Sequence, residues 1–256
     1  MLLALQQRRV IEQPVAIVVA HPDDETIGVG GSMHLMRNLL LVHVTDGAPR
    51  RLDDAARAGF ATAEAYAAAR AAELDAAMAL SGTRPERLML GVPDQDASEA
   101  MPETAARLRE LFRAHRIEAV LTHPYEGGHP DHDAISLAVH LAASGGPDVF
   151  EFALYHAGPA GGLRTQAFLP GPAETVVALP AHDAARKAAM IACFRTQVKM
   201  LSQFDAKTER FRAAPAYDFT AAPHPGPLNY ENWGWSMTGT EWRKRASRAL
   251  EARCAA

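Results

Sequence analysis

The chain has 256 residues, of which 48% are hydrophobic and 22% are charged. It is therefore long enough to bury a full hydrophobic core, and its composition argues against intrinsic disorder. The formal net charge of −4 offers no basic stripe, so we expect no nucleic-acid partner. Cys193 and Cys254 lie far apart and match no zinc-finger or C-x-x-C spacing, which favours a reducing compartment.

The start of the chain, residues 1–13, contains charged side chains after a very short apolar stretch, and it does not resemble a signal peptide. No run reaches the roughly 18 apolar residues that a membrane-spanning helix requires. From these features we expect a cytoplasmic protein without a membrane span. The sequence carries no indication of the oligomeric state.

Short β-branched or leucine-rich runs alternate along the chain with longer alanine-rich stretches. In chain order, we expect strands over 15–19, 39–45, 87–90, 119–122, 149–155 and 175–179. Between and after them we expect helices over 30–37, 54–80, 101–115, 134–143, 184–204 and 240–252. This alternation predicts an α/β fold with three layers, α/β/α, in which helices cover both faces of a mostly parallel sheet.

Polar clusters follow the first four predicted strands. They comprise residues 21–25, 45–47, 92–94 and 123–132. In sheets of this kind the ligand site lies at the carboxyl ends of the strands. The four clusters are therefore expected to converge on one edge of the sheet, and this convergence is stronger evidence than any single cluster.

Two of these clusters contain His-Pro-Asp, at residues 21–23 and 129–131, and the second continues into His132. His21 and Asp24 are three residues apart, so in a turn that bends into a helix both project from one side, whereas Asp23 points about 100° away. His21 and Asp24 can thus reach one metal together, while Asp23 is better placed to reach a water bound to it. The second cluster supplies a further ligand, either His129 or His132.

Two histidines, one carboxylate and an open position are typical of a catalytic zinc site. Such a site makes water acidic enough for a nearby carboxylate to take its proton, which predicts metal-dependent hydrolysis. The remaining histidine of the second cluster would be the acid or the oxyanion stabiliser. The alternative is that the aspartates cap helices and the histidines are ordinary core residues. A single His-Pro-Asp would favour that alternative, but two at strand ends favour the metal.

These motifs carry a family resemblance. The segment A-H-P-D-D-E at 20–25, followed by G-V-G-G at 28–31 and H-P-D-H at 129–132, resembles the PIG-L/LmbE-like N-acetylglucosaminyl deacetylases. The resemblance extends to T-D-G at 45–47, R-A-A-E at 70–73 and V-P-D at 92–94. It implies a Rossmann-like fold, a Zn²⁺ cofactor (or another divalent metal such as Fe²⁺) and a small-molecule N-acetyl sugar or glycoconjugate as the substrate.

Carried over residue by residue, the resemblance assigns three metal ligands, a general base and two residues beside the reacting amide. The ligands are His21, Asp24 and His132, and the base is Asp23. His129 would lie beside the oxyanion or the leaving amine, with Asp131 tuning it. The choice of His132 over His129 as the third ligand rests on the resemblance alone.

Three further residues are candidates for substrate binding. Arg70 and Glu73 are three apart, and their spacing alone favours a solvated ion pair within a helix; the resemblance instead implies that Arg70 contacts a substrate hydroxyl. Asp94 lies in a proline-containing loop, where turn chemistry explains it as well as a sugar hydroxyl does. Tyr125 could assist an oxyanion or could only pack.

All three tryptophans, Trp233, Trp235 and Trp242, lie near the C-terminus. We favour a hydrophobic plug slightly over a stacking wall for a sugar, and we regard 205–240 as an aromatic lid or closing segment of a single deacetylase domain over 1–256. The glycines at 28–31 lack the full G-x-G-x-x-G pattern, so we expect close packing of a helix on the sheet rather than nucleotide binding.

The sequence therefore predicts a zinc-dependent hydrolase that removes the acetyl group from an N-acetylated amino sugar or its conjugate. One alternative is a zinc amidase that acts on a non-sugar or thiol-conjugate amide. The other, of a different class, is a non-catalytic Rossmann-like module that binds a metal or a nucleotide.

Overall fold

The computed structural model describes residues 1–158 and 161–254. Its main feature is a seven-stranded sheet in the order β3-β2-β1-β4-β5-β9-β8. In chain order these strands are β1 (Val15–Val19), β2 (Leu39–Pro49), β3 (Glu86–Asp94), β4 (Ala119–Thr122), β5 (Asp148–Phe152), β8 (Glu174–Ala178) and β9 (Thr208–Ala213). Strands β1 to β5 are parallel to one another, whereas β9 runs antiparallel to both β5 and β8.

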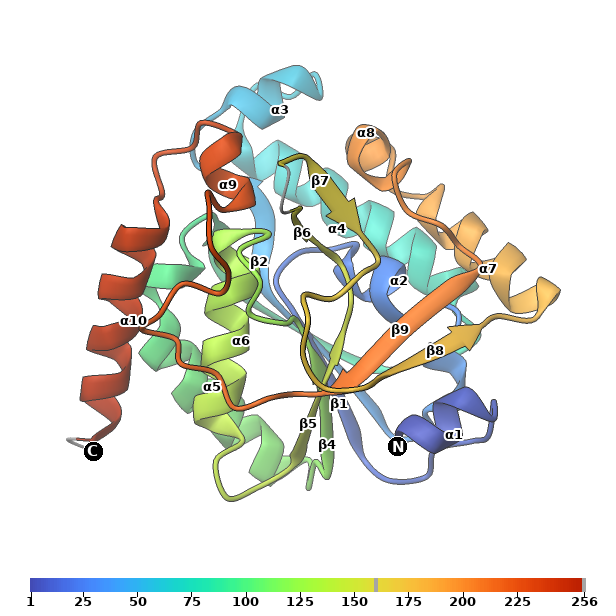
Figure 1. The fold of residues 1–256 in the computed structure, drawn as a ribbon. Coiled ribbons are helices and arrows are strands. Elements are labelled where there is room, and N and C mark those ends of the chain that lie inside the picture. Colours follow the sequence, from blue (N-terminus) through green and yellow to red (C-terminus); the bar gives the residue numbers. More distant parts are fainter. Residues whose placement is uncertain (159–160, 255–256) are drawn as a thin grey trace.

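Helices cover both faces of this sheet (Figure 1). One face carries α1 (Leu2–Gln6), α2 (Asp24–Val29), α4 (Ala63–Leu80) and α7 (Ala181–Ile191), and the other carries α5 (Met101–Ala114), α6 (Pro130–Ala142) and α10 (Gly239–Cys254). The predicted three-layer α/β/α fold with a mostly parallel sheet is confirmed. Residues 159–160 and 255–256 of the predicted domain lie outside the described residues.

Smaller elements gather where the parallel strands end, at the top of Figure 1. They are the helices α3 (Asp53–Arg57), α8 (Val198–Leu201) and α9 (Asn229–Asn232), and the hairpin of β6 (Tyr155–Ala157) and β7 (Leu163–Thr165). Three 3₁₀ turns complete the described structure: η1 (Met33–Leu35), η2 (Ala97–Glu99) and η3 (Arg195–Gln197). The carboxyl edge of the sheet is thus walled by short segments from distant parts of the chain.

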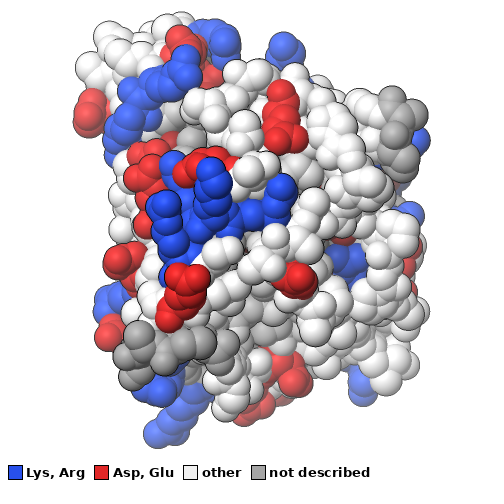
Figure 2. Space-filling model, turned by 60° about the vertical axis from the view of Figure 1, so that its left-hand side comes forward, with Lys and Arg blue, Asp and Glu red and all other residues white. Residues whose placement is uncertain are grey.

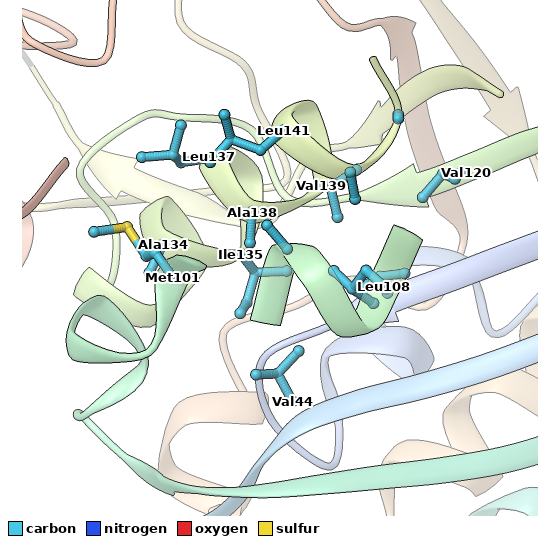
Figure 3. Packing of buried hydrophobic residues seen from close by; sticks show 14 of the residues in the cluster. Val44, Met101, Leu108, Val120, Ala134, Ile135, Leu137, Ala138, Val139 and Leu141 are labelled. Carbon is cyan, nitrogen blue, oxygen red and sulfur yellow. The ribbon is translucent and has the colours of Figure 1, made fainter. Parts of the chain in front are cut away.

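The central strand β1 is apolar throughout because both of its faces are covered. Ala16 and Val18 belong to the core beneath α5 and α6, and Val15, Ile17 and Val19 belong to the core beneath α2 and α4. Figure 3 shows the first of these cores, in which side chains of α5 and α6 pack toward the sheet. A continuous β-branched run, rather than an alternating one, is typical of such a doubly covered parallel strand.

Three predicted helices differ clearly from the structure, and the one expected over 54–80 is divided into α3 and α4. The first of the three begins at Asp24 rather than at residue 30 and ends at Val29. It lies so close to β5 that a Cβ on Gly28 would come within 2.3 Å of the Phe152 ring, which confirms the close packing expected from the glycines. The predicted helix over 184–204 is interrupted, since α7 ends at Ile191 and α8 is a separate short helix.

Strand β9, which lies inside the segment predicted to be a lid, was not predicted from the sequence. Its residues Thr208–Ala213 include Glu209 and Arg212, which are only 2% exposed. Charged residues normally indicate solvent exposure, but Glu209 accepts a hydrogen bond from the buried Lys187 ammonium at 3.0 Å. Such pairing is what allows charged groups to be buried in a central strand.

Charged side chains of both signs cover the outer surface. Figure 2 shows Lys and Arg side chains gathered into one patch, bordered by Asp and Glu, on the side of the molecule that carries α5 and α10. Helix α10 contributes basic residues, and Arg245 forms ion pairs with Glu99 and Glu241. Within the described residues, no helix is both long and apolar enough to cross a membrane.

A buried network centred on Arg212 joins β9 and β5 to the loop that carries the second His-Pro-Asp cluster. The Arg212 guanidinium donates to Glu126 at 3.0 Å and to Glu151 at 2.7 Å. Glu126 also accepts from the Leu169 amide at 2.7 Å. Burial raises the pKa of Glu126 to about 8 and that of Glu151 to about 7, although Arg212 opposes both shifts.

This network predicts a pH dependence of stability. Because both carboxyl pKa values are raised in the folded state, the folded protein holds more protons than the unfolded chain. The stabilisation that follows is complete below the pKa of the unfolded chain and is lost as the pH rises toward 8. The variant Glu151→Gln mimics the protonated acid, so its melting temperature should fall less steeply between about pH 5 and pH 8. Thermal melts of the wild type, Glu151→Gln and the more exposed control Glu174→Gln would measure this; equal slopes in all three would contradict it.

Candidate metal centre and cavity

The two His-Pro-Asp clusters meet at the point where the order of the strands reverses. Strand β1 pairs with β2 on one side and with β4 on the other, so the chain leaves β1 in one direction and later returns on the opposite side. The first cluster leads from β1 into α2, and the second leads from the loop after β4 into α6. This topological switch point is the place where open α/β sheets bind their ligands.

Asp24 lies between the two histidines predicted as ligands, and His21, His129 and His132 also form one group of possible metal donors, with their nitrogen atoms within 4.8 Å of one another. His21 Nδ1 is 3.3 Å from one carboxylate oxygen of Asp24, and His132 Nε2 is 3.3 Å from the other. In a tetrahedral zinc site with bonds of 2.0–2.1 Å, neighbouring ligand atoms are about 3.3 Å apart. His132 Nε2 is buried and has no hydrogen-bond partner among the described residues, so it is free to bind a metal.

Carboxylates surround His21. Its Nε2 lies 3.1 Å from Asp131 and 3.2 Å from Asp94, and its Nδ1 faces Asp24. Burial alone would lower the pKa of His21, but these three carboxylates raise it well above its usual value. A divalent cation at this place would meet the same negative charges, so the donor set fits a metal in charge as well as in spacing.

Asp131 contacts His21 more closely than it contacts His129. Its carboxylate lies 3.1 Å from His21 Nε2 but 4.0 Å from His129 Nδ1, and it also accepts hydrogen bonds from the Gln95 and Ala97 amides. A carboxylate that binds one ring nitrogen of a histidine orients the other nitrogen toward a metal. Asp131 is therefore placed to orient His21, rather than to tune His129 as the resemblance implies.

Asp23 has a strained backbone. Its φ of 136° is rare for a residue other than glycine, and it lies at the N-terminus of α2. The Asp23 amide donates to Glu25 at 3.1 Å, and the buried Glu25 carboxylate is also 3.0 Å from His43 Nε2. This buried pair holds the backbone of Asp23 in its unusual conformation.

The side chain of Asp23 faces Arg70. Arg70 donates to the Asp23 carboxylate at 2.9 Å, to the Pro22 carbonyl at 2.8 Å and to the Gly47 carbonyl at 2.7 Å. Burial raises the pKa of Asp23 to about 8, although the Arg70 charge opposes this shift. A carboxylate with a raised pKa that lines a cavity is a suitable proton acceptor.

The ion pair between Arg70 and Glu73 that the spacing favoured is not formed. Arg70 turns inward to Asp23 and lies 3.8 Å from Asp94, whereas Glu73 accepts hydrogen bonds from the amide and the hydroxyl of Thr196. Both Arg70 and Asp94 line the cavity, although each is almost fully buried.

His129 caps the N-terminus of α6. Its Nδ1 accepts from the Asp131 amide at 3.1 Å, so the neutral ring carries its proton on Nε2. Burial, together with the neighbouring His21 and His132, lowers the pKa of His129 well below its usual value. The neutral imidazole therefore presents an N–H group on its Nε2 side, 3.8 Å from Asp94.

His123 supports the third ligand from behind. Its ring stacks on His132 at 4.1 Å between centroids, and its Nε2 accepts from the Ala20 amide at 2.9 Å. His123 is fully buried, so its ring restricts the orientation of His132.

Tyr125 lies outside the cavity lining. Its hydroxyl donates to the Ala221 carbonyl at 2.9 Å, and its ring stacks on Trp242 at 5.1 Å. The packing alternative for Tyr125 therefore describes its position, and a role in substrate binding does not. Instead, Tyr155 of β6 lines the cavity, with its ring centroid 5.1 Å from that of His132.

Two residues beside the site could not be found from the sequence, since neither His43 nor Tyr155 belongs to a motif. The three tryptophans lie in different environments. Trp242 is a buried plug whose indole N–H donates to the Pro130 carbonyl at 3.0 Å, whereas Trp233 and Trp235 line the cavity. Only the density of aromatic residues near the C-terminus signalled the last two.

The cavity above the candidate ligands has a volume of about 1300 Å³. Its floor is formed by His21, Asp23, Asp24, Arg70, Asp94 and His129. Its walls come from the segments after β2, from η3 and α8, and from the tryptophan loop. Since ligand pockets commonly measure about 300–1000 Å³, this one exceeds what a single small sugar requires.

Comparison with known proteins supports these observations. The family profile of PIG-L, described as GlcNAc-PI de-N-acetylase, matches residues 16–143. A curated relative, 1D-myo-inositol 2-acetamido-2-deoxy-alpha-D-glucopyranoside deacetylase 2 of Catenulispora acidiphila, is 33% identical over 140 residues, or 45% of this chain and 46% of that protein. The chain thus spans about half the length of this relative.

Solved structures share the fold at lower identity. The antimicrobial reagent A40926 pseudoaglycone deacetylase has a TM-score of 0.62 and 17% identity, covering 81% of this chain and 100% of its own. A 4-carboxy-2-hydroxymuconate hydratase of Pseudomonas putida has a TM-score of 0.59 and 19% identity, covering 80% of this chain and 98% of its own. The fold alone therefore does not decide the reaction. The family profile covers half of the chain and contains both His-Pro-Asp clusters, so the chain belongs to the PIG-L (GlcNAc-PI de-N-acetylase) family.

Proposed function

We propose that this protein is a zinc-dependent hydrolase that removes the acetyl group from an N-acetylated amino sugar or sugar conjugate. The observation that carries the proposal is that Asp24 lies 3.3 Å from both His21 and His132, with the strained Asp23 next to it in the chain. Membership of the PIG-L family and the curated deacetylase relative support the same reaction. A purely binding module would have no need of a strained carboxylate with a raised pKa at the cavity floor.

His21, Asp24 and His132 would hold the metal, with Zn²⁺ favoured by the two imidazoles and Fe²⁺ also compatible. When bound there, the metal would supply Lewis-acid polarisation of the amide carbonyl and acidify water. Asp131 orients His21, and His123 supports His132. Each histidine ligand thus has a neighbour that fixes its ring.

The chain's own residues account for the proton transfers. Asp23 accepts a proton from the attacking water, and Arg70, at 2.9 Å, keeps its carboxylate oriented toward the cavity. The neutral His129 donates a hydrogen bond from its Nε2–H to the oxyanion, and the proton that Asp23 takes from the water is passed on to the departing amine. Asp94 and Arg70 are placed to receive hydroxyl groups of the sugar.

The substrate proposed here is a conjugate rather than a free monosaccharide, because the cavity of about 1300 Å³ extends well beyond the candidate metal site. The direct test is a panel of N-acetyl sugars, including nucleotide- and lipid-linked ones, assayed for released acetate. Release from none of the sugars, together with release from simple non-sugar amides, would favour the alternative of a non-sugar zinc amidase.

The first prediction concerns metal content. Purified protein should contain about one divalent metal per chain, and both His21→Ala and His132→Ala should lose it because each removes one of three ligands. Elemental analysis of protein purified with and without oxygen would identify the metal. His140→Ala, on the same helix as His132, should retain it. Full metal content in both ligand variants would refute the site.

The second prediction separates the base from the ligands. Asp23→Asn should bind metal normally but lose turnover by about 10²-fold or more, since an amide cannot accept the proton. Acetate release and metal content are measured on the same preparation. Wild-type turnover in this variant would remove the proposed role of Asp23.

The third prediction concerns the buried support of Asp23. His43→Leu leaves the Glu25 carboxylate without its imidazole partner, so the Asp23 backbone should lose its fixed position and turnover should fall by about tenfold. The metal content and KM should stay near the wild-type values, because His43 contacts neither the candidate metal ligands nor the lining of the cavity. His43→Gln, which retains an N–H donor, should recover most of the turnover; equal turnover in the Leu variant and the wild type would show that the pair does not position Asp23.

A further inference from the structure

We propose that Trp233 and Trp235 form a stacking platform that binds the apolar face of the substrate's pyranose ring, and we call these two residues the indole platform. This inference rests on the proposed function, because it names the part of the substrate that the same cavity recognises. Both residues lie on the loop between α9 and α10, outside the segment that the family profile matches.

The indole platform stands beside the candidate metal centre. The Trp235 ring meets the His129 ring edge to face, with centroids 4.9 Å apart. Trp233 lies 4.9 Å from Trp235 and 6.0 Å from Tyr155. A ring resting on these indoles would therefore be next to the imidazole that is proposed to meet the reacting amide.

The loop that carries the platform is held at both ends. One carboxylate oxygen of Glu231 accepts from the Leu228 amide at 2.7 Å and the other accepts from the Gly239 amide at 2.8 Å. The Asn229 side chain donates to the Gly128 carbonyl at 3.0 Å, which ties the loop to the turn before His129. Gly234, with a φ of 72°, supplies the left-handed turn between the two indoles. The platform is thus preorganised relative to the site.

The indoles remain available to a ligand. Trp233 is 38% exposed, in contrast to the fully buried Trp242. Trp242 donates its indole N–H to the Pro130 carbonyl, whereas neither Trp233 nor Trp235 has an indole hydrogen bond to another described residue. Trp233 is exposed and Trp235 is half-buried, so part of each indole remains open to a ligand.

The chemistry of the cavity matches a pyranose ring. Such a ring has an apolar face of C–H groups and an edge of hydroxyls. Each indole of the platform offers a flat apolar face, the two planes being inclined by 58° to one another, and Asp94 and Arg70 line the same cavity on the side of the hydroxyls. A small open-chain amide has no extended face for the indoles to cover.

The test compares a sugar acetamide with an open-chain acetamide in Trp235→Ala, Trp233→Ala and the double variant. We expect KM for an N-acetylglucosamine glycoside to rise by about tenfold or more in Trp235→Ala, with kcat within about twofold. KM for the open-chain acetamide should stay unchanged. Trp235→Phe keeps an aromatic face and should recover most of the affinity, and Met89→Ala removes a similarly exposed apolar side chain from the edge strand β3 as a control.

A binding measurement keeps this inference separate from the proposed function. Calorimetric titration of the methyl glycoside of N-acetylglucosamine into Asp23→Asn protein, with and without Trp235→Ala, requires no turnover. Weaker binding in the tryptophan variant supports the platform even if no acetate is released by the wild type. Equal binding with and without Trp235, or an equal loss for the open-chain acetamide, would overturn it.

Discussion

The structure depends on negative charge gathered at the carboxyl ends of three strands, β1, β3 and β4. Asp24, Asp94 and Asp131 are almost fully buried around His21, at a place where unpaired carboxylates would be strongly destabilising. The imidazole can balance this charge only in part, and it must become neutral to bind a metal. The surrounding elements converge on this charge: α2 and α6 both begin there, and the segment after β3 contributes the Gln95 and Ala97 amides to Asp131, so the proposed cation would be stabilised at this place.

The same constraint explains why one residue of the cluster is strained. Asp24 and Asp23 are adjacent, yet Asp24 faces the two histidine ligands while Asp23 faces Arg70. The side chains of two adjacent residues can point in such different directions only if the backbone between them turns sharply. The φ of 136° at Asp23 provides this turn. The conformation persists because Glu25, paired with His43, holds the Asp23 amide from below.

The sequence predicts the parts of the molecule that depend on local pattern. The buried runs at 15–19 and 119–122 became β1 and β4 with the predicted bounds, because a strand covered on both faces is apolar throughout. The clusters after them met as expected, since parallel strands end at the same edge. By contrast, β9 could not be predicted from the sequence, because its buried charged side chains are paired with residues elsewhere in the chain, such as Lys187 and Glu126. The partners of Arg70 and Glu25 were hidden for the same reason: a three-residue spacing suggested Glu73 for Arg70, but tertiary contacts decided otherwise.

The candidate metal ligands and much of the cavity wall come from different parts of the chain, and this difference bears on substrate specificity. The matched family segment ends at residue 143 and contains the candidate ligands and base, whereas much of the wall of the cavity comes from later residues, including Tyr155, η3, α8 and the indole platform. A fold that also occurs in a hydratase must derive its particular chemistry from side chains placed on the common strand ends. In this chain, the loop with Trp233 and Trp235 is tied by the Asn229 side chain directly to the turn that precedes His129. Substrate recognition and the proposed proton transfer therefore share one rigid connection, so a ring bound on the indoles would be held in a fixed relation to the amide beside the metal.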